Sequence, residues 1–513
     1  MATAPPAAQA RLGDKNLSTI HAVAQALAIG PMFSTAIVLS LVSSPATGAA
    51  FNTPLAVLLA GLGVLSIGYV LALYARKFAG AGAVYEYLTH GAHPSVGIFT
   101  AGLFFVGTLF LGGGGIYLGL GILANGFWAE HIGDASNAPA WWVFGTIALA
   151  IVLVMNYLGV RIALRAMLTF AACSFIPMLL LALVIIVKGG DSGNSLQVFN
   201  PGQTSLLGVT GGGVLGGILV GILLFVGFEA AASIGEESHD PHRSIPRAVL
   251  ATIAASAAFY VVMSYAIAIG YGESAVSAGK WISDPAYLDT MATRYVGSWL
   301  ATIIDLVVIL DAMGLALAIC VTIGRGYFAL GRDGLLPSFF AKTSRHDTPW
   351  VGNLVVCVGW GFLVFVATGT GWMDKFLPIF GTSEFSAFIV SATAGSFAIE
   401  LVYLILALGA VRLVMRDQGP WWQYVVVLIA IATPLLGFYG ALNPSPHTTD
   451  NPNWLALYWA LAVVVIAAVW YGAVQLTRPD RVRNAAAHAA AHHGVAPLDE
   501  NLDFTPAPPD TAV

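Results

Sequence analysis

Twelve long apolar runs constrain the fold of this chain more than any other feature of its sequence. A helix needs about 20 residues to cross the roughly 30 Å hydrocarbon core of a bilayer, where only helices and closed barrels satisfy every backbone hydrogen bond. The runs lie near 17–44, 53–75, 95–126, 140–159, 163–187, 211–236, 246–271, 297–330, 350–369, 376–410, 421–441 and 454–475. Charged residues make up only 9% of the chain, whereas soluble domains carry roughly 25%. The sequence therefore predicts an all-α membrane protein with about 12 transmembrane helices.

The positions of the lysines and arginines predict how these helices are oriented. Of the 21 lysines and arginines, 17 lie in the two tails or in loops that follow even-numbered runs. The other 4, Lys188, Lys280, Arg294 and Lys375, lie in the opposite set of loops. Because cytoplasmic loops are enriched in basic residues, we expect both termini to be cytoplasmic in a multi-pass protein of the cell membrane.

The predicted domain organisation is a tail, one membrane domain and a second tail. We expect a cytoplasmic tail over 1–16, a transmembrane domain over 17–476, and a disordered cytoplasmic tail over 477–513 that includes His488 and His492. The cysteines Cys173, Cys320 and Cys357 have no metal-ligand spacing, and no basic patch suggests nucleic acid. We therefore expect no cofactor, metal or nucleic-acid partner.

Two interrupted helices predict a substrate site. Gly30 and Pro31 interrupt the first run, and Gly227 interrupts the sixth after a glycine-rich approach that includes Gly211 to Gly213. Such matched breaks mark the sites of many secondary transporters, because the exposed amides attract an anion and the exposed carbonyls attract a cation. The alternative is that these residues only permit kinks or close packing. The candidate binding residues are Ile29, Gly30, Pro31, Met32, Phe33, Ser34, Tyr117, Phe225, Gly227 and Phe228.

Three further motifs carry a resemblance to a known family. The stretch from Phe225 to Glu229, followed by Glu236 to Ala248, resembles the helix-six signature of the amino acid, polyamine and organocation superfamily. The sequence RGYFALGRDGLLP at 325–337 and the segment NYLGVR at 156–161 resemble other parts of the same permeases. The resemblance covers about 15–475.

This resemblance implies the fold of the bacterial leucine transporter. That fold has two inverted five-helix repeats, here about 17–187 and 211–410, and two further helices over 421–475. It implies a permease that moves an amino acid or related amine by alternating access. Two departures stand out, because Met32 replaces a second glycine of helix one and helix five lacks the mid-helix lysine of some proton-coupled members.

Acidic residues within the runs are candidates for ion coupling, because a charge in a membrane helix is costly. We expect Glu229 to carry a proton and Asp311 to be the reserve carrier, while Asp305, Glu384 and Glu400 are placed nearer to helix ends and water. A scaffold role for Glu229 at the helix break stays open. A sodium site of the leucine-transporter type would need paired hydroxyls in helix eight, where only Thr322 is present. Near the inner mouth, Glu236 and Glu237 are expected to pair with Arg243 and Arg247 or to form a solvated charge cluster.

Other function classes fit the sequence less well. An enzyme would need a catalytic constellation at membrane depth, but His21 is the only histidine in the first run and the others lie in loops or tails. A non-transporting solute sensor is the alternative to a symporter or antiporter. Such a sensor would normally add a signalling domain. The identity of the substrate, the coupling ion and the oligomeric state stay open.

Overall fold

The computed structural model describes residues 12, 16–107, 113–133, 135–204, 206, 213–369, 383–442, 452–483 and 485. These residues contain helices and no strand, and one isolated bridge joins Leu17 to Ser238. Most of both predicted tails lies outside the described residues, including His488 and His492, as do Gly211, Gly212 and Lys375. The start of the predicted disordered tail is helical over 479–483.

The α-helices follow the chain order of the predicted runs. They are α1 (Thr19–Ala26), α2 (Pro31–Phe33), α3 (Leu39–Val42), α4 (Thr53–Ala75), α5 (Val84–Gly91), α6 (Pro94–Gly107), α7 (Gly113–His131), α8 (Trp141–Leu158), α9 (Val160–Lys188), α10 (Gly213–Leu223), α11 (Pro241–Tyr271), α12 (Glu273–Ser277), α13 (Tyr287–Tyr295), α14 (Ser298–Arg332), α15 (Trp350–Gly369), α16 (Ser383–Arg416), α17 (Trp421–Leu442) and α18 (Pro452–Thr477).

Short helices of other types complete the chain. The 3₁₀ helices are η1 (Leu27–Ile29), η3 (Ala50–Asn52), η5 (Ala135–Asn137), η6 (Leu196–Phe199), η7 (Phe228–Ile234) and η8 (Ser338–Ala341), and η2 (Ser34–Val38) is a π-helix. The first and sixth runs each contain such a segment, which is where the sequence predicts the helix breaks.

Each of the twelve predicted runs contains a helix. Within the described residues, ten helical segments are long and apolar enough to cross a membrane. The run at 95–126 is filled by α6 and α7, with 108–112 outside the described residues, and the run at 350–369 is filled by α15. The multi-pass helical prediction is therefore confirmed.

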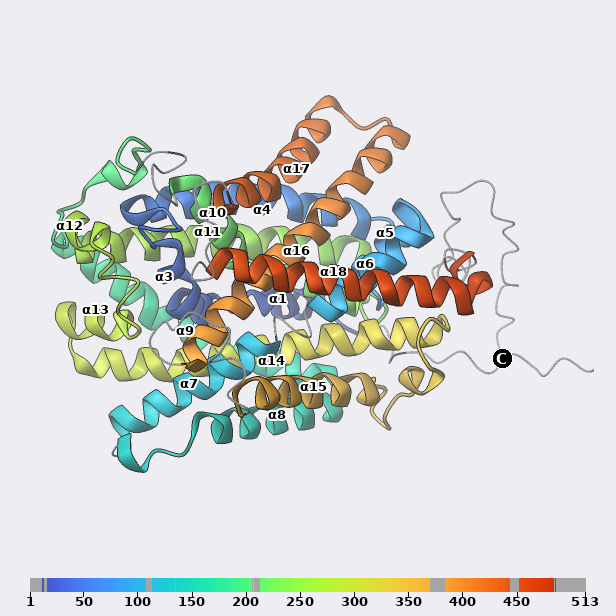
Figure 1. The fold of residues 1–513 in the computed structure, drawn as a ribbon, viewed down its shortest axis with the longest axis horizontal. Helices are drawn as coiled ribbons and strands as arrows, with labels where there is room; N and C mark the ends of the chain where they lie inside the picture. The colour runs from blue at the N-terminus through green and yellow to red at the C-terminus, as the bar shows by residue number, and fades with distance from the viewer. Residues whose placement is uncertain are drawn as a thin grey trace, which may run out of the picture.

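The helices with the breaks lie in the interior of the bundle. Within an apolar 18-residue stretch of each span, about 78% is buried in the first span, 83% in the sixth and 78% in α14, against 28% in α8 and 22% in α18. The peripheral helices instead expose large apolar side chains such as Ile151, Val154 and Val465. Such side chains suit contact with lipid, because the hydrocarbon core is as apolar as they are. In Figure 1 the helices α14 and α18 follow the long axis and α16 crosses it obliquely, with α12 and α13 at one end and α5 toward the other.

Candidate functional site

The first span is broken in its middle at Gly30. Gly30 has φ 56° and ψ 64°, the left-handed conformation, and it ends η1. A side chain in this conformation costs about 1–2 kcal/mol, so glycine suits the position. Pro31 then starts α2, where its fixed φ fits the first helical turn and its missing N–H costs nothing. The break is thus a consequence of two neighbouring residues.

The sixth span is broken at Gly227. This residue has φ 121° and precedes η7. A Cβ atom built on Gly227 would lie 2.1 Å from the backbone oxygen of Ala28 in η1. The two breaks therefore meet backbone to backbone, and only glycine permits this approach. This contact gives Gly227 a packing role, which was the alternative interpretation of the glycine.

At each break, the carboxylate of an acidic side chain accepts hydrogen bonds from backbone amides. Oδ2 of Asp311 in α14 accepts hydrogen bonds from the amides of Met32 at 2.9 Å and Phe33 at 3.0 Å. Oε2 of Glu229 accepts from the Gly227 amide at 3.0 Å and from the Tyr403 hydroxyl at 2.8 Å. Each carboxylate is only 4% exposed. These donors can stabilise negative charge on two carboxylates that are almost fully buried.

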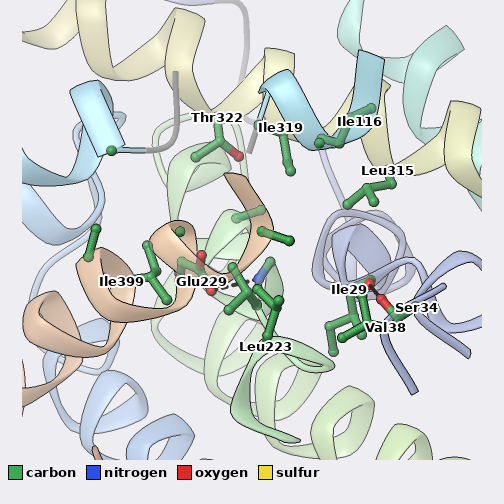
Figure 2. A pocket seen from close by; sticks show the side chains of 18 of the residues that line it. Ile29, Ser34, Val38, Ile116, Leu223, Glu229, Leu315, Ile319, Thr322 and Ile399 are labelled. Carbon is green, nitrogen blue, oxygen red and sulfur yellow. Dashed lines mark hydrogen bonds between the residues drawn. The ribbon is translucent and has the colours of Figure 1, made fainter. Parts of the chain in front are cut away.

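An apolar cavity of about 110 Å³ lies beside the two breaks and is lined by residues of both. Its wall comes from the first and sixth spans and from α6, α7, α14 and α16. Figure 2 shows Glu229 among hydrocarbon side chains that include Leu223 and Ile399. Glu229 is the single ionisable side chain among the described residues that line this cavity. The arrangement can hold a small apolar molecule beside one acidic group.

The structure brings some predicted site residues to the cavity and places others behind it. Ile29, Phe33, Ser34, Gly227 and Glu229 line the cavity. Those that do not are Gly30, Pro31, Met32, Tyr117, Phe225, Phe228 and Asp311.

Three of the predicted aromatic residues have contacts outside the cavity wall. The Tyr117 hydroxyl donates to the carbonyl of Trp142 at 3.2 Å. Phe225 packs edge-on against Tyr260. Phe228 stacks on Tyr403, the residue that donates to Glu229, so it supports the carboxylate from behind.

Several lining residues are not predicted by the sequence. They come from helices without a break and are Leu103, Phe104, Ile116, Leu315, Ile319, Thr322, Phe388 and Ile399. All except Thr322 are apolar residues of apolar helices, so nothing in the sequence separates them from ordinary core residues. Thr322 could have been singled out from the sequence, because it is the one hydroxyl residue at the place in helix eight where a sodium site would need two.

The Thr322 hydroxyl accepts a hydrogen bond from Gln25, a residue of the first span. Nε2 of Gln25 donates to Thr322 Oγ1 at 3.2 Å and to the Ala318 carbonyl at 2.9 Å. An amide NH₂ group therefore contacts both oxygens of α14. Gln25 is fully buried, and its own Oε1 has no hydrogen-bond partner.

Ion pairs close the end of the bundle that the sequence assigns to the cytoplasm. Arg325 Nε lies 2.7 Å from Glu237 Oε2, and these side chains are 1% and 5% exposed. Arg332 binds Glu236 with two hydrogen bonds of 2.8 and 3.0 Å. The predicted pairing of Glu236 and Glu237 with Arg243 and Arg247 is wrong. Arg243 lies in the first turn of α11 and its side chain is exposed, whereas α14 extends to Arg332 and supplies both arginines that pair with the two glutamates.

An aromatic side chain separates the central cavity from a second cavity toward the other end. Phe388 lines both cavities, and its ring packs edge-on against Phe33 at 6.3 Å. The second cavity is lined by Asp289 and Asp305 among other residues. Burial and the nearby charge of Asp305 raise the pKa of Asp289, which lies in α13 outside the spans, to about 8.

The other predicted intramembrane acids have different surroundings. Glu384 lies in the first turn of α16, as expected, and accepts from the Trp141 indole at 3.1 Å. The placement of Glu400 near water is wrong, because it is fully buried and paired with Ser396 at 3.0 Å. Asp305 bonds to His131 at 2.9 Å, and with Glu130 they form a group whose ligand atoms lie within 4.8 Å. Glu130 and His131 are exposed, and such groups are common on protein surfaces without a metal.

Comparisons with known proteins agree with this architecture. A model of the amino acid permease family matches residues 22–468. The lysine-specific permease LysP of Lactococcus lactis is 26% identical over 268 residues, 48% of this chain and 51% of that protein. The branched-chain amino acid permease BcaP of Bacillus subtilis is 26% identical over 286 residues, 56% of this chain and 57% of that protein. The chain thus spans about half the length of these curated relatives.

A solved structure shows a similar fold. The crystal structure of MhsT in complex with L-phenylalanine superposes with a TM-score of 0.55 at 17% sequence identity, covering 84% of this chain and 100% of that chain. At this identity the likeness concerns the fold alone. It confirms the predicted leucine-transporter-type arrangement of helices.

Proposed function

This chain belongs to the amino acid permease family, and we propose that it is a secondary active transporter of an amino acid or a related amine. The observation that carries the proposal is the cavity where two broken helices meet in the middle of the bundle. Broken helices supply backbone groups at membrane depth, where a solute can bind between two repeats. The permease names of the relatives support the same class of activity.

Alternating access is supported by the different closures at the two ends of the cavity. Ion pairs involving Arg325 and Arg332 close one end, and Phe388 forms a thin aromatic barrier at the other. Breaking the ion pairs would open a path to the predicted cytoplasmic side, and moving one aromatic ring would open a path to the second cavity. We infer that the described arrangement is closed on the cytoplasmic side of the cell membrane.

We propose coupling to protons through Glu229, with Asp311 as the reserve carrier. Glu229 lines the cavity and is held by two donors, so its charge depends on contacts at the helix break. A substrate that approaches this carboxylate, or a movement of Tyr403, changes the stability of the charged form. Such a group can exchange its proton as the two ends open in turn.

The contacts of Gln25 support independence from sodium. Its NH₂ group already donates to the Thr322 hydroxyl and the Ala318 carbonyl, the oxygens that face helix one at this point. A sodium ion there would have to displace a fully buried amide. We expect uptake to be the same in sodium and choline media.

Transport by proteoliposomes tests the proposal. Uptake of amino acids and amines should follow an imposed pH gradient without sodium. Glu229→Gln should retain substrate exchange at saturating substrate, because the amide keeps an oxygen acceptor in the cavity, but lose accumulation, because the amide cannot release a proton. Glu400→Gln is the matched control, because Glu400 is also buried but does not line the cavity. Saturable binding without flux would contradict transport, and accumulation that needs a sodium gradient would contradict proton coupling.

A further inference from the structure

We propose that the substrate is a cationic amine without an α-carboxylate, because Asp311 fills the amide site at the break of helix one. This inference rests on the proposed transport function and narrows its substrate class. Helix one breaks where a carboxylate would find unpaired amides. In this chain the acceptor for those amides is supplied from α14.

The amides at the start of the second half of helix one are all accounted for. Pro31 has no N–H, and the amides of Met32 and Phe33 both donate to Asp311 Oδ2. The Ser34 amide donates to the Gly30 carbonyl at 2.8 Å. No N–H in this first turn is therefore left for a carboxylate from the substrate. An incoming carboxylate would have to displace Asp311 within a buried site.

The break of helix six repeats the pattern. The Gly227 amide donates to Glu229 Oε2 at 3.0 Å. A substrate carboxylate beside this amide would also meet the charge of Glu229. At both breaks, therefore, an acidic side chain of the protein already accepts from the backbone amides: Asp311 at the first break and Glu229 at the second.

The charge of the cavity wall favours a cation over a zwitterion. No lysine, arginine or histidine is among the described residues that line the cavity, and Glu229 is its one acidic residue. A carboxylate placed here would lose its water without gaining a positive partner. An ammonium group gains Glu229 as a partner, and the Phe33 and Phe388 rings offer further weak attraction to a cation.

The remainder of the cavity suits a short hydrocarbon chain or ring. Its volume is about 110 Å³, and its wall is formed mainly by aliphatic and aromatic side chains. The substrate class is therefore a small primary amine with an apolar body. A long polyamine with several charges would bring ammonium groups against the apolar wall without acidic partners.

The test compares compounds that differ only in the α-carboxylate. The purified full-length protein is reconstituted in liposomes, and isoamylamine competes with leucine, and phenethylamine with phenylalanine, for binding and counterflow. We expect each amine to bind at least tenfold more tightly than its amino acid. Tighter binding of the amino acid in both pairs would overturn the inference while leaving the transport function intact. Flux of neither member would overturn the transport function and, with it, the inference.

Variants of Asp311 test the cause of the preference. Asp311→Ala vacates the Met32 and Phe33 amides, so the ratio of amine to amino acid affinity should fall at least tenfold. Asp311→Asn keeps an oxygen acceptor for the same amides and should keep amines preferred. Asp305→Ala removes a carboxylate from the outer part of the same helix and should leave the ratio unchanged. A ratio that is unchanged in a folded Asp311→Ala protein would overturn the assignment. If that variant does not fold, the ratios of the parent and of Asp311→Asn decide.

Discussion

The buried pair of Arg325 and Glu237 permits a prediction about how the cavity opens. Glu237→Ala leaves the Arg325 guanidinium, 1% exposed, without its carboxylate at 2.7 Å. Removing one partner of a buried pair costs about 3–5 kcal/mol, because the remaining charge stays desolvated. If Arg325 reaches water when this end of the bundle opens, the variant destabilises the closed state by this amount and leaves the free energy of the open state unchanged. At about 1.4 kcal/mol per tenfold change, the ratio of open to closed protein should rise by about 10²- to 4 × 10³-fold.

Cysteine labelling measures this shift. Ile319 lines the central cavity, so Ile319→Cys in a background without the three native cysteines reports access to it. An impermeant maleimide applied from the predicted cytoplasmic side should react much faster in the Glu237→Ala variant. Removing both partners, in Glu237→Ala with Arg325→Ala, should restore part of the protection because no unpaired charge remains.

A surface pair provides the matched control. Arg243 and Asp240 lie 3.9 Å apart and their side chains are 76% and 49% exposed, so Arg243→Ala should leave labelling unchanged. Equal labelling rates in the parent and Glu237→Ala proteins would refute the reasoning. So would equally fast labelling of the Arg243→Ala protein, since the effect would then not depend on burial.

Three more predictions concern the other end of the cavity and the orientation of the chain. Phe388→Ala should speed labelling of Ile319→Cys from the outer side, whereas Ile282→Ala, at a residue that lines the outer cavity but not the central one, should not; equal rates would refute a barrier role. Because the folded-state pKa of Asp289 is raised to about 8, the folded protein binds more protons than the unfolded one between about pH 4 and 8, and this residue's contribution to stability is lost as the pH rises toward 8. Asp289→Asn should therefore raise the melting temperature more at pH 8 than at pH 5, and an equal shift at both would contradict the assignment. Single cysteines at the exposed positions Asn194 and Lys342 should label from the outside and from the cytoplasm respectively, and labelling of both from one side would overturn the topology.

The sequence by itself determined the membrane class, the order of the helices and the positions of the breaks. These features are local: an apolar run must form a helix in a bilayer whatever its neighbours are. Gly30, Pro31 and Gly227 interrupt helices through their own backbone properties. The motifs around Glu229 and at 325–337 carried the family, which the match over 22–468 confirmed.

Only the tertiary structure decided what the breaks bind. Asp311 and Met32 are 279 residues apart, and Gln25 and Thr322 are 297 apart, so helix packing alone brings these groups within hydrogen-bond distance. From the sequence, Asp311 can be singled out as an acidic residue within an apolar helix, but the groups that it binds cannot be identified. The apolar cavity wall is equally invisible in the sequence, because a leucine beside a cavity and a leucine in the core have the same chemistry. A backbone amide at a break is free to bind a substrate only where no side chain from another helix already accepts its hydrogen bond, and the packing of the helices decides this.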